Sequence, residues 1–429
     1  MGMNDYPETK LPAVIDEEST NRAMIANILK FAIKQQQLAE STLRSKQIQV
    51  AADEFSKQLA VKGYRTSTRI KTIGHKMTEE PSTTTTTSTT LRPRGRSSAE
   101  SSEESGEIVF KILVTHPEVP KEALELMGRA CKLIMCESLP PNRTEILQKA
   151  KGVHGMFWGS HIPLNKEVLD AAGPQLKSIS TMSAGIDYVD VEELKKRKIP
   201  LGHTPIVLSN AVADLAMGLM LSAARRFHEG RTKIDSSTWE NYHIEWMWGQ
   251  EIRESTVGFF GFGSIGQAIA KRLKGFDIAR VLYTTRRPID KELEQEFNAA
   301  KVEFHELLAE SDFLFIAAPL TPETEGIFNA TAFPKMKKTA VLINIARGPI
   351  VNQDDLYTAL KTNQIFSAGI DVMNPEPLSA NDKLLTLPNI VITPHIGSAT
   401  KRTRTDMAII AAHNVLRGLA GEPMLSPAY

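Results

Sequence analysis

The chain has 429 residues, a length that suggests two or three domains, and its contents of 41% hydrophobic and 24% charged residues are ordinary for a globular protein. A net charge of +1 gives no general attraction to nucleic acid or to anionic membranes, and no apolar run of about 18 residues predicts a membrane span. The only two cysteines, Cys131 and Cys136, have neither zinc nor redox spacing, so we expect core thiols, no metal and a cytoplasmic protein.

Residues 1–107 differ from the rest of the chain and are expected to form an N-terminal extension. The stretch from Glu17 to Ala60 has a diluted helical pattern, typical of a loosely held helix. From Pro81 to Glu107 the chain is rich in Ser, Thr, Arg and Glu, which predicts a disordered linker. Basic residues on the helix are compatible with a mitochondrial transit peptide, but the acidic residues before them disfavour one.

From residue 108 onward, apolar runs alternate with helical segments, which predicts an α/β fold with doubly wound parallel sheets. The first unit, residues 108–206, has predicted strands at Ile108–Val114, Lys132–Cys136, Gly155–Trp158 and Leu176–Thr181. We predict that it is the substrate domain.

The second unit, residues 207–402, is predicted to be a Rossmann domain that binds NAD(P). It begins with a helix over Ser209–Arg226. Six strands are predicted, at Val257–Gly261, Val281–Tyr283, Phe313–Ala317, Ala340–Ile345, Ser367–Val372 and Ile390–Thr393. A last helix over Thr403–Leu419 is expected to return to the first unit, so that residues 403–429 complete it and a cleft separates the two domains.

A glycine motif, Gly261-x-Gly263-x-x-Gly266, follows the first strand of the second unit. Gly261 permits a tight turn, Gly263 lets the backbone approach a pyrophosphate, and Gly266 lets the following helix lie against the strand. The free N–H groups at the start of that helix would face the anion. Strand, glycines and helix in this order predict a dinucleotide site.

The residues after the next strand bear on the choice of cofactor. An acid that binds the ribose 2′-hydroxyl is expected about 20 residues past the glycines. The chain instead has Thr284, Arg286 and Arg287 in this region. Arginine holds a 2′-phosphate well, so NADPH/NADP is favoured, while NADH stays open.

Three polar residues, Arg347, Glu376 and His395, each follow a predicted strand of the second unit. Singly, each is compatible with a simpler role: a charge beside a helix, a turn residue and a core histidine. Together at the carboxyl ends of parallel strands they predict reduction of a 2-keto acid. Arg347 would hold the carboxylate and polarise the ketone, His395 would donate a proton, and Glu376 would orient the imidazolium. Asp371 is expected to face the carboxamide side of the cofactor.

Residues 108–429 resemble the D-2-hydroxyacid dehydrogenases. The motifs that carry the resemblance are Ser180–Asp187, Gly258–Ala270, Leu320–Gly326, Ile343–Gly348, Val351–Leu356, Gly369–Val372 and Pro394–Thr400. The resemblance implies a flavodoxin-like substrate domain beside the Rossmann domain, and catalysis by Arg347, Glu376 and His395. We expect cofactor contacts from Gly261, Gly263, Ser264, Ile265, Gly266, Thr284, Arg286, Arg287, Pro319, Ile345, Asp371 and Gly397. Substrate contacts are expected from Ser160, His161, Ser183, Ala184, Gly185, Trp246, Arg347, His395 and Ser398.

Within the family, the chain looks most like animal enzymes that reduce glyoxylate to glycolate and hydroxypyruvate to D-glycerate, which implies small 2-keto and 2-hydroxy acids as its partners. Trp246 matches a tryptophan that in similar enzymes enters the neighbouring subunit's active site, which implies a homodimer. The alternative is a buried cluster of Trp239, Trp246 and Trp248. Gly159–His161 departs from the Leu-Leu-Ser type sequence of similar enzymes, so another keto acid or NADH preference stays open. A corepressor-like NAD(P)-binding scaffold is the remaining alternative.

Overall fold

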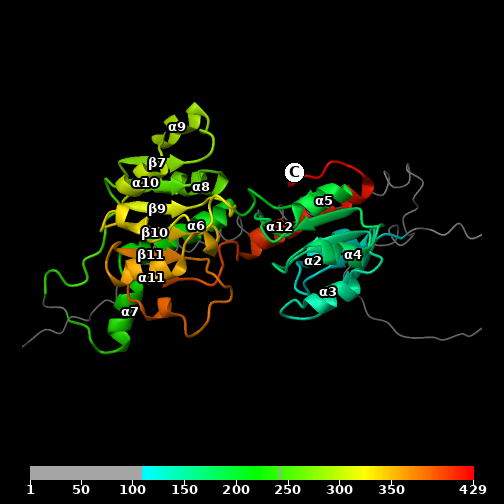
Figure 1. Cartoon of the computed structure of the whole chain (residues 1–429), viewed down its shortest axis with the longest axis horizontal. Coiled ribbons are helices and arrows are strands. Elements are labelled where there is room, and N and C mark those ends of the chain that lie inside the picture. The colour runs from blue at the N-terminus through cyan, green and yellow to red at the C-terminus, as the bar shows by residue number, and fades with distance from the viewer. Residues whose placement is uncertain (1–108, 241–242) are drawn as a thin grey trace, which may run out of the picture. The chain divides into compact units, whose positions relative to one another are not determined.

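A computed structural model of the protein describes residues 109–240 and 243–429, which belong to one structural unit of the chain. The helix and linker predicted within residues 1–107 lie outside the described residues. Within the described part, two parallel sheets are each covered by helices (Figure 1). No helix in this part combines the length and apolar character needed to cross a bilayer.

The first sheet has five parallel strands in the order β2-β1-β3-β4-β5. Its strands are β1 (Lys111–Val114), β2 (Lys132–Met135), β3 (Gly155–Trp158), β4 (Ser178–Thr181) and β5 (Leu201–Gly202). Helices α2 (Lys121–Gly128), α3 (Arg143–Lys149), α4 (Lys166–Ala172) and α5 (Val191–Arg197) connect them. All residues of β3 and β4 are buried, as expected for central strands covered on both faces.

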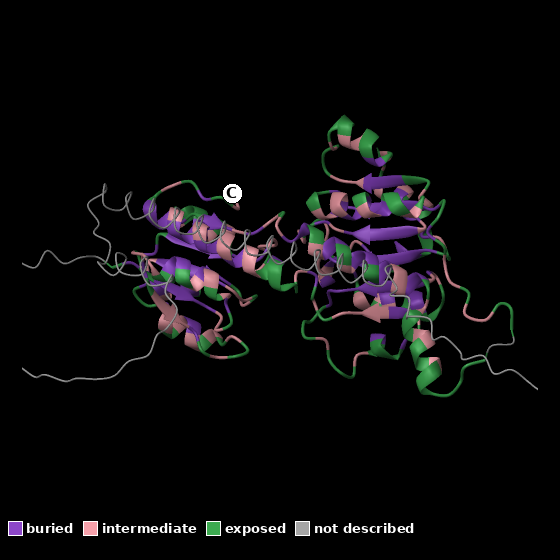
Figure 2. Ribbon diagram, turned by 180° about the vertical axis from the view of Figure 1, so that it is seen from behind, coloured by how far each residue is buried: buried purple, intermediate pink, exposed green. Residues whose placement is uncertain are grey.

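The second sheet has seven parallel strands in the order β12-β11-β10-β9-β6-β7-β8. They are β6 (Thr256–Phe260), β7 (Arg280–Thr284), β8 (Ala299–Lys301), β9 (Phe313–Ile316), β10 (Val341–Asn344), β11 (Ser367–Ile370) and β12 (Ile390–Ile392). The predicted count of six strands was wrong, because β8 is a short, largely exposed edge strand without an apolar run. The central strands are buried along their length (Figure 2).

The strand order of this sheet predicts where a ligand crevice lies. The chain runs outward from β6 through β7 to β8, and then resumes on the other side of β6 with β9. At such a reversal the loops after neighbouring strands diverge, and the crevice outside their carboxyl ends receives the ligand. The crevice therefore lies at the ends of β6 and β9.

Helices cover the second sheet. They are α6 (Ser209–Ala224), α8 (Ser264–Leu273), α9 (Lys291–Phe297), α10 (Phe304–Glu310) and α11 (Gln353–Lys361), with short 3₁₀ turns η2 (Lys274–Phe276), η3 (Phe333–Lys335), η4 (Gly348–Ile350) and η5 (Lys383–Thr386). Helix α7 (Phe227–Asp235) follows α6 and has no buried residue. Helix α6 packs against α8 and against β10, β11 and β12. It therefore contributes to the core of the second sheet.

The last helix, α12 (Lys401–Ala420), begins after the second sheet but packs against α2, β3, β4 and β5 of the first. Asn414 of α12 is fully buried and donates to the His203 carbonyl oxygen at 3.2 Å and to Ser426 Oγ at 3.1 Å. Because a buried amide without partners costs free energy, these bonds help to fix α12 on the first sheet. The residues after β12 thus lead from one sheet to the other.

Candidate active site

The glycine turn after β6 has the geometry of a phosphate cradle. Gly261 has φ of +91°, and its N–H donates to the Thr284 carbonyl oxygen at 3.0 Å. A Cβ on Gly261 would lie 2.5 Å from Ala318 N, so no larger residue fits there. A Cβ on Gly263 would meet no atom within 4 Å, and Gly266 is buried in the first turn of α8. The open backbone at Gly263 beside the start of α8 fits a pyrophosphate.

The residues predicted to choose the cofactor follow β7. Arg286 and Arg287 are both exposed, so their guanidinium groups are accessible to a ligand. The Thr284 hydroxyl donates to the Val302 carbonyl oxygen at 2.8 Å, which uses its proton inside the protein. Of this predicted group, the two arginines are therefore better placed than Thr284 to bind an anion.

A cavity of about 700 Å³ lies at the carboxyl ends of the strands and is lined from both sheets. It brings together thirteen of the predicted residues: His161, Ser183, Ala184, Gly185, Ser264, Ile265, Pro319, Ile345, Arg347, Asp371, His395, Gly397 and Ser398. Ser160, Glu376 and Trp246 do not line it, and neither do the glycine turn and the Thr284–Arg287 segment. We call this cavity the catalytic pocket.

His395 and Glu376 form a hydrogen-bonded pair at this pocket. His395 Nδ1 lies 2.7 Å from Glu376 Oε2, while Glu376 Oε1 accepts the Met373 N–H at 3.0 Å. Burial raises the pKa of Glu376, but the hydrogen bonds from His395 and Met373 outweigh it and hold this pKa below its usual value. An ionised Glu376 orients the ring and leaves Nε2 as the nitrogen available for proton transfer.

Asp371 supports the turn that carries His395. Its carboxylate accepts the Thr393 hydroxyl at 2.6 Å and the backbone N–H groups of Ile396 and Gly397, each at 2.8 Å. Asp371 lines the catalytic pocket. We expected its carboxylate to face the carboxamide of the cofactor, whereas its two oxygens accept hydrogen bonds from the turn. The structure therefore gives Asp371 a supporting place behind His395.

Arg347 lies across the pocket and is held by a residue of the first unit. Its Nε donates to Asp187 Oδ1 at 2.9 Å, and its Nη1 donates to the Ala346 carbonyl oxygen at 2.8 Å. The guanidinium lies over Gly185, where a Cβ would clash with Nη2. Asp187 had no predicted role, although it ends one of the motifs that carry the family resemblance. This ion pair leaves the Nη2 edge for a substrate.

His161 stacks on His395 in the same pocket. The ring centroids are 5.5 Å apart with an interplanar angle of 20°, and the His161 ring meets the Tyr188 ring edge-on at 5.3 Å. Burial, followed by the charges of His395 and Arg347, lowers the pKa of His161, which favours the neutral ring. The neighbouring Ser160 hydroxyl is buried and has no hydrogen-bond partner in the described part of the chain.

The tryptophans do not form the buried cluster that we considered as an alternative, so that alternative is wrong. Trp239 and Trp248 are 62% and 59% exposed, and Trp246 is half-buried. Phe227 and Ile234 of α7 are also exposed, and α7 has no buried residue. Phe227, Ile234, Trp239 and Trp248 therefore present apolar side chains at the surface of the described structure.

Comparison with known proteins identifies relatives along most of the chain. Residues 217–397 match the family model described as D-isomer specific 2-hydroxyacid dehydrogenase, NAD binding domain. The human glyoxylate reductase/hydroxypyruvate reductase is 47% identical over 321 residues, which cover 74% of this chain and 97% of the human protein.

Solved structures show the same fold. A Thermus thermophilus protein has a TM-score of 0.67 and 37% identity, over 75% of this chain and 100% of its own. The NADPH-dependent glyoxylate/hydroxypyruvate reductase of Sinorhizobium meliloti, solved with NADP and malonate, has a TM-score of 0.62 and 28% identity, over 74% of this chain and 96% of its own.

Proposed function

This chain belongs to the D-isomer specific 2-hydroxyacid dehydrogenase family of oxidoreductases, and we propose that it reduces glyoxylate to glycolate and hydroxypyruvate to D-glycerate with NADPH. The observation that carries the proposal is the convergence of Arg347 and of the His395–Glu376 pair on one pocket beside a glycine turn. The substrate is proposed from the names of the relatives that the chain matches over nearly their whole length.

The residues of the pocket account for the chemistry. The Arg347 guanidinium binds the substrate carboxylate and polarises the ketone, with the Ser183–Gly185 backbone beside it. Bound NADPH supplies the hydride. His395 Nε2 donates a proton to the developing alkoxide, and the Glu376 carboxylate, hydrogen-bonded to Nδ1, keeps the ring in its orientation. Oxidation of the hydroxy acid uses the same groups, with His395 as the base.

The preference for NADPH rests on Arg286 and Arg287. Both are exposed after β7, the region where a dinucleotide fold contacts the ribose, and no acid replaces them there. A carboxylate would repel a 2′-phosphate, whereas a guanidinium can bind it bidentately, through two N–H···O hydrogen bonds. The Sinorhizobium meliloti relative is described as NADPH-dependent, which agrees with this assignment.

The domain organisation follows from the same proposal. Residues 108–206 with 403–429 would bind the substrate, and residues 207–402 would bind the cofactor. The exposed side chains of Phe227 and Ile234 on α7 and of Trp239, Ile244 and Trp248 fit a homodimer interface from which Trp246 reaches the partner's pocket. Light scattering would give twice the mass of one chain.

A cytoplasmic location is proposed on sequence grounds alone and can be tested by cell fractionation.

Steady-state rates of the purified full chain test the proposal. We expect turnover of glyoxylate and hydroxypyruvate, faster with NADPH than with NADH, and a loss of at least about 100-fold in kcat for His395→Ala. A corepressor-like scaffold would bind the cofactor, seen by its fluorescence, but turn over neither acid. A His395→Ala variant with wild-type activity would contradict the role of His395 as proton donor.

A further inference from the structure

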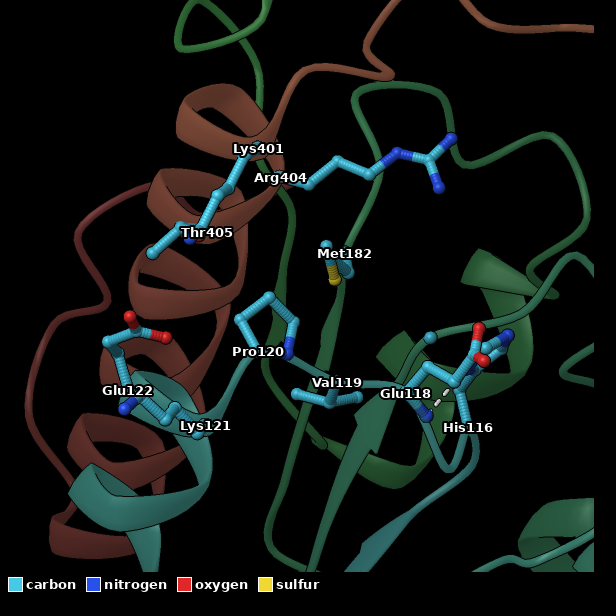
Figure 3. Close-up of a pocket in the computed structure, with 11 residues that line it drawn as sticks. His116, Glu118, Val119, Pro120, Lys121, Glu122, Met182, Lys401, Arg404 and Thr405 are labelled. Carbon is cyan, nitrogen blue, oxygen red and sulfur yellow. Dashed lines mark hydrogen bonds between the residues drawn. The ribbon is translucent and has the colours of Figure 1, made fainter.

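A second cavity, of about 480 Å³, is shown in Figure 3 and shares part of its lining with the catalytic pocket. Its lining side chains come from the loop after β1, from the start of α2, from Met182 after β4 and from the start of α12. Gly159, Met182 and Arg404 line both this cavity and the catalytic pocket. A substrate whose ketone lies between Arg347 and His395 can therefore extend its far end toward the second cavity.

Gly159 keeps the space between the two cavities open. It follows β3, and its N–H donates to Thr115 Oγ1 at 2.8 Å, which fixes the backbone at this point. A Cβ on Gly159 would lie 3.0 Å from His116 Cβ, closer than most side-chain contacts. A larger residue here would fill the boundary between the cavities, so the absence of a side chain decides how far the substrate space reaches.

Arg404 is a cation of this boundary without an ion-pair partner among residues 109–240 and 243–429. The other two arginines of α12 do pair: Arg402 with Asp406 and Arg417 with Glu422, each at 3.9 Å. Arg404 is also exposed, so its guanidinium is available to a ligand. On this helix, the arginine that faces the cavities is the one left for an anion.

The other groups of the cavity give it a small positive balance. Lys121, Lys401 and Arg404 supply three positive charges and Glu118 and Glu122 two negative ones, which leaves +1. His116 Nδ1 accepts the Glu118 N–H at 3.1 Å, so a neutral His116 ring carries its proton on Nε2 and can donate it. Burial lowers the pKa of His116. The negative charge of Glu118 raises this pKa and the positive charge of Arg404 lowers it, and the balance is a lowered pKa.

We propose that this second cavity is a substrate subsite, in which Arg404 binds the distal carboxylate or phosphate of a 2-keto acid longer than glyoxylate. The inference rests on the proposed reductase function. The reaction is unchanged: the ketone carbon receives the hydride from NADPH, which becomes NADP⁺, and its oxygen receives the proton from His395. The subsite adds only recognition of the second anionic group.

The test compares four substrates on the full chain with NADPH: glyoxylate, oxaloacetate with a distal carboxylate, 3-phosphohydroxypyruvate with a distal phosphate, and the uncharged-tail 2-ketobutyrate. For Arg404→Met, kcat/KM for at least one of the two doubly anionic acids should fall at least about tenfold relative to 2-ketobutyrate. The acid that is affected identifies the distal group. Arg402→Met, which removes a charge from the same helix turn outside both cavities, should change this ratio less than about twofold.

Gly159→Leu gives an independent readout, because it narrows the space without changing the charge. It should lower kcat/KM for all three longer acids relative to glyoxylate. The relevant ratios are kcat/KM for each doubly anionic acid divided by kcat/KM for 2-ketobutyrate. If the wild-type chain reduces glyoxylate but Arg404→Met changes both ratios by less than about twofold, the subsite proposal is wrong. It is also wrong if Arg402→Met changes these ratios as much as Arg404→Met does. A wild-type chain that reduces none of the four acids would instead overturn the proposed function itself. Arg404→Met decides the matter if Gly159→Leu does not fold.

Discussion

The backbone N–H of His395 donates to the carbonyl oxygen of Asp371 at 2.8 Å, so the strand end that carries Asp371 directly holds the proposed proton donor. His395 has φ of +52°, a left-handed conformation that is unfavourable for a residue with a side chain. The two N–H groups that follow it donate to the Asp371 carboxylate. Asp371 therefore offsets the strain of the turn and fixes the direction of the imidazole.

Asp371→Ala should loosen this turn. The buried Gly397 N–H left without an acceptor costs about 1–3 kcal/mol, and a catalytic group displaced by about 1 Å costs roughly 100-fold in rate. We expect both a lower free energy of unfolding in urea and a loss of about 100-fold in kcat. The control, Asn142→Ala, removes the cap of α3 far from the pocket and should cost about 1 kcal/mol with kcat unchanged. An Asp371→Ala enzyme with normal kcat would contradict the supporting role.

Gly185→Ala should displace Arg347. The added Cβ would clash with Nη2 and would lie 2.8 Å from Cζ, so the guanidinium must leave its place beside Asp187. We expect kcat/KM for glyoxylate to fall at least about tenfold with little change in thermal stability. Gly218→Ala is the matched control, because a Cβ there meets nothing within 4 Å. Equal activities of the two variants would show that Arg347 does not need this position.

How much the sequence predicts depends on whether the signal is local. Buried parallel strands are continuous apolar runs, so β9 (Phe313–Ile316) is found easily, whereas β8 has no such run and was missed. The glycine turn and the strand-end positions of Arg347 and His395 are also local patterns. The pairing of Arg347 with Asp187 joins residues 160 positions apart, and only the folded chain reveals it. The stacking of His161 on His395 is of the same kind.

His161 should make the fold less stable in mild acid. Its pKa in the folded protein is below the ordinary value of 6.5, so the unfolded chain binds the proton more readily. Stability is therefore lost as the pH falls below about 6.5. His161→Phe retains a ring that can stack but cannot take the proton, and its urea midpoint should fall less between about pH 7.5 and 5.5 than that of the wild type. His305→Phe, at a position outside the catalytic pocket, is the control, and a fall equal to the wild type's in His161→Phe would contradict the assignment.

Replacing the two arginines after β7 should change the choice of cofactor. Arg286→Asp with Arg287→Ser removes both guanidinium groups and adds a carboxylate, which repels a 2′-phosphate and can accept a 2′-hydroxyl. The ratio of kcat/KM with NADPH to that with NADH should fall at least about tenfold, mostly through KM for NADPH, because the reacting groups are untouched. Lys291→Asp with Lys301→Ser makes the same change of charge at two exposed positions, the start of α9 and the end of β8, and should leave the ratio near the wild-type value. An unchanged ratio in the arginine variant would mean that the 2′-phosphate, if bound, is held elsewhere, and the preference for NADPH would then lose its structural basis.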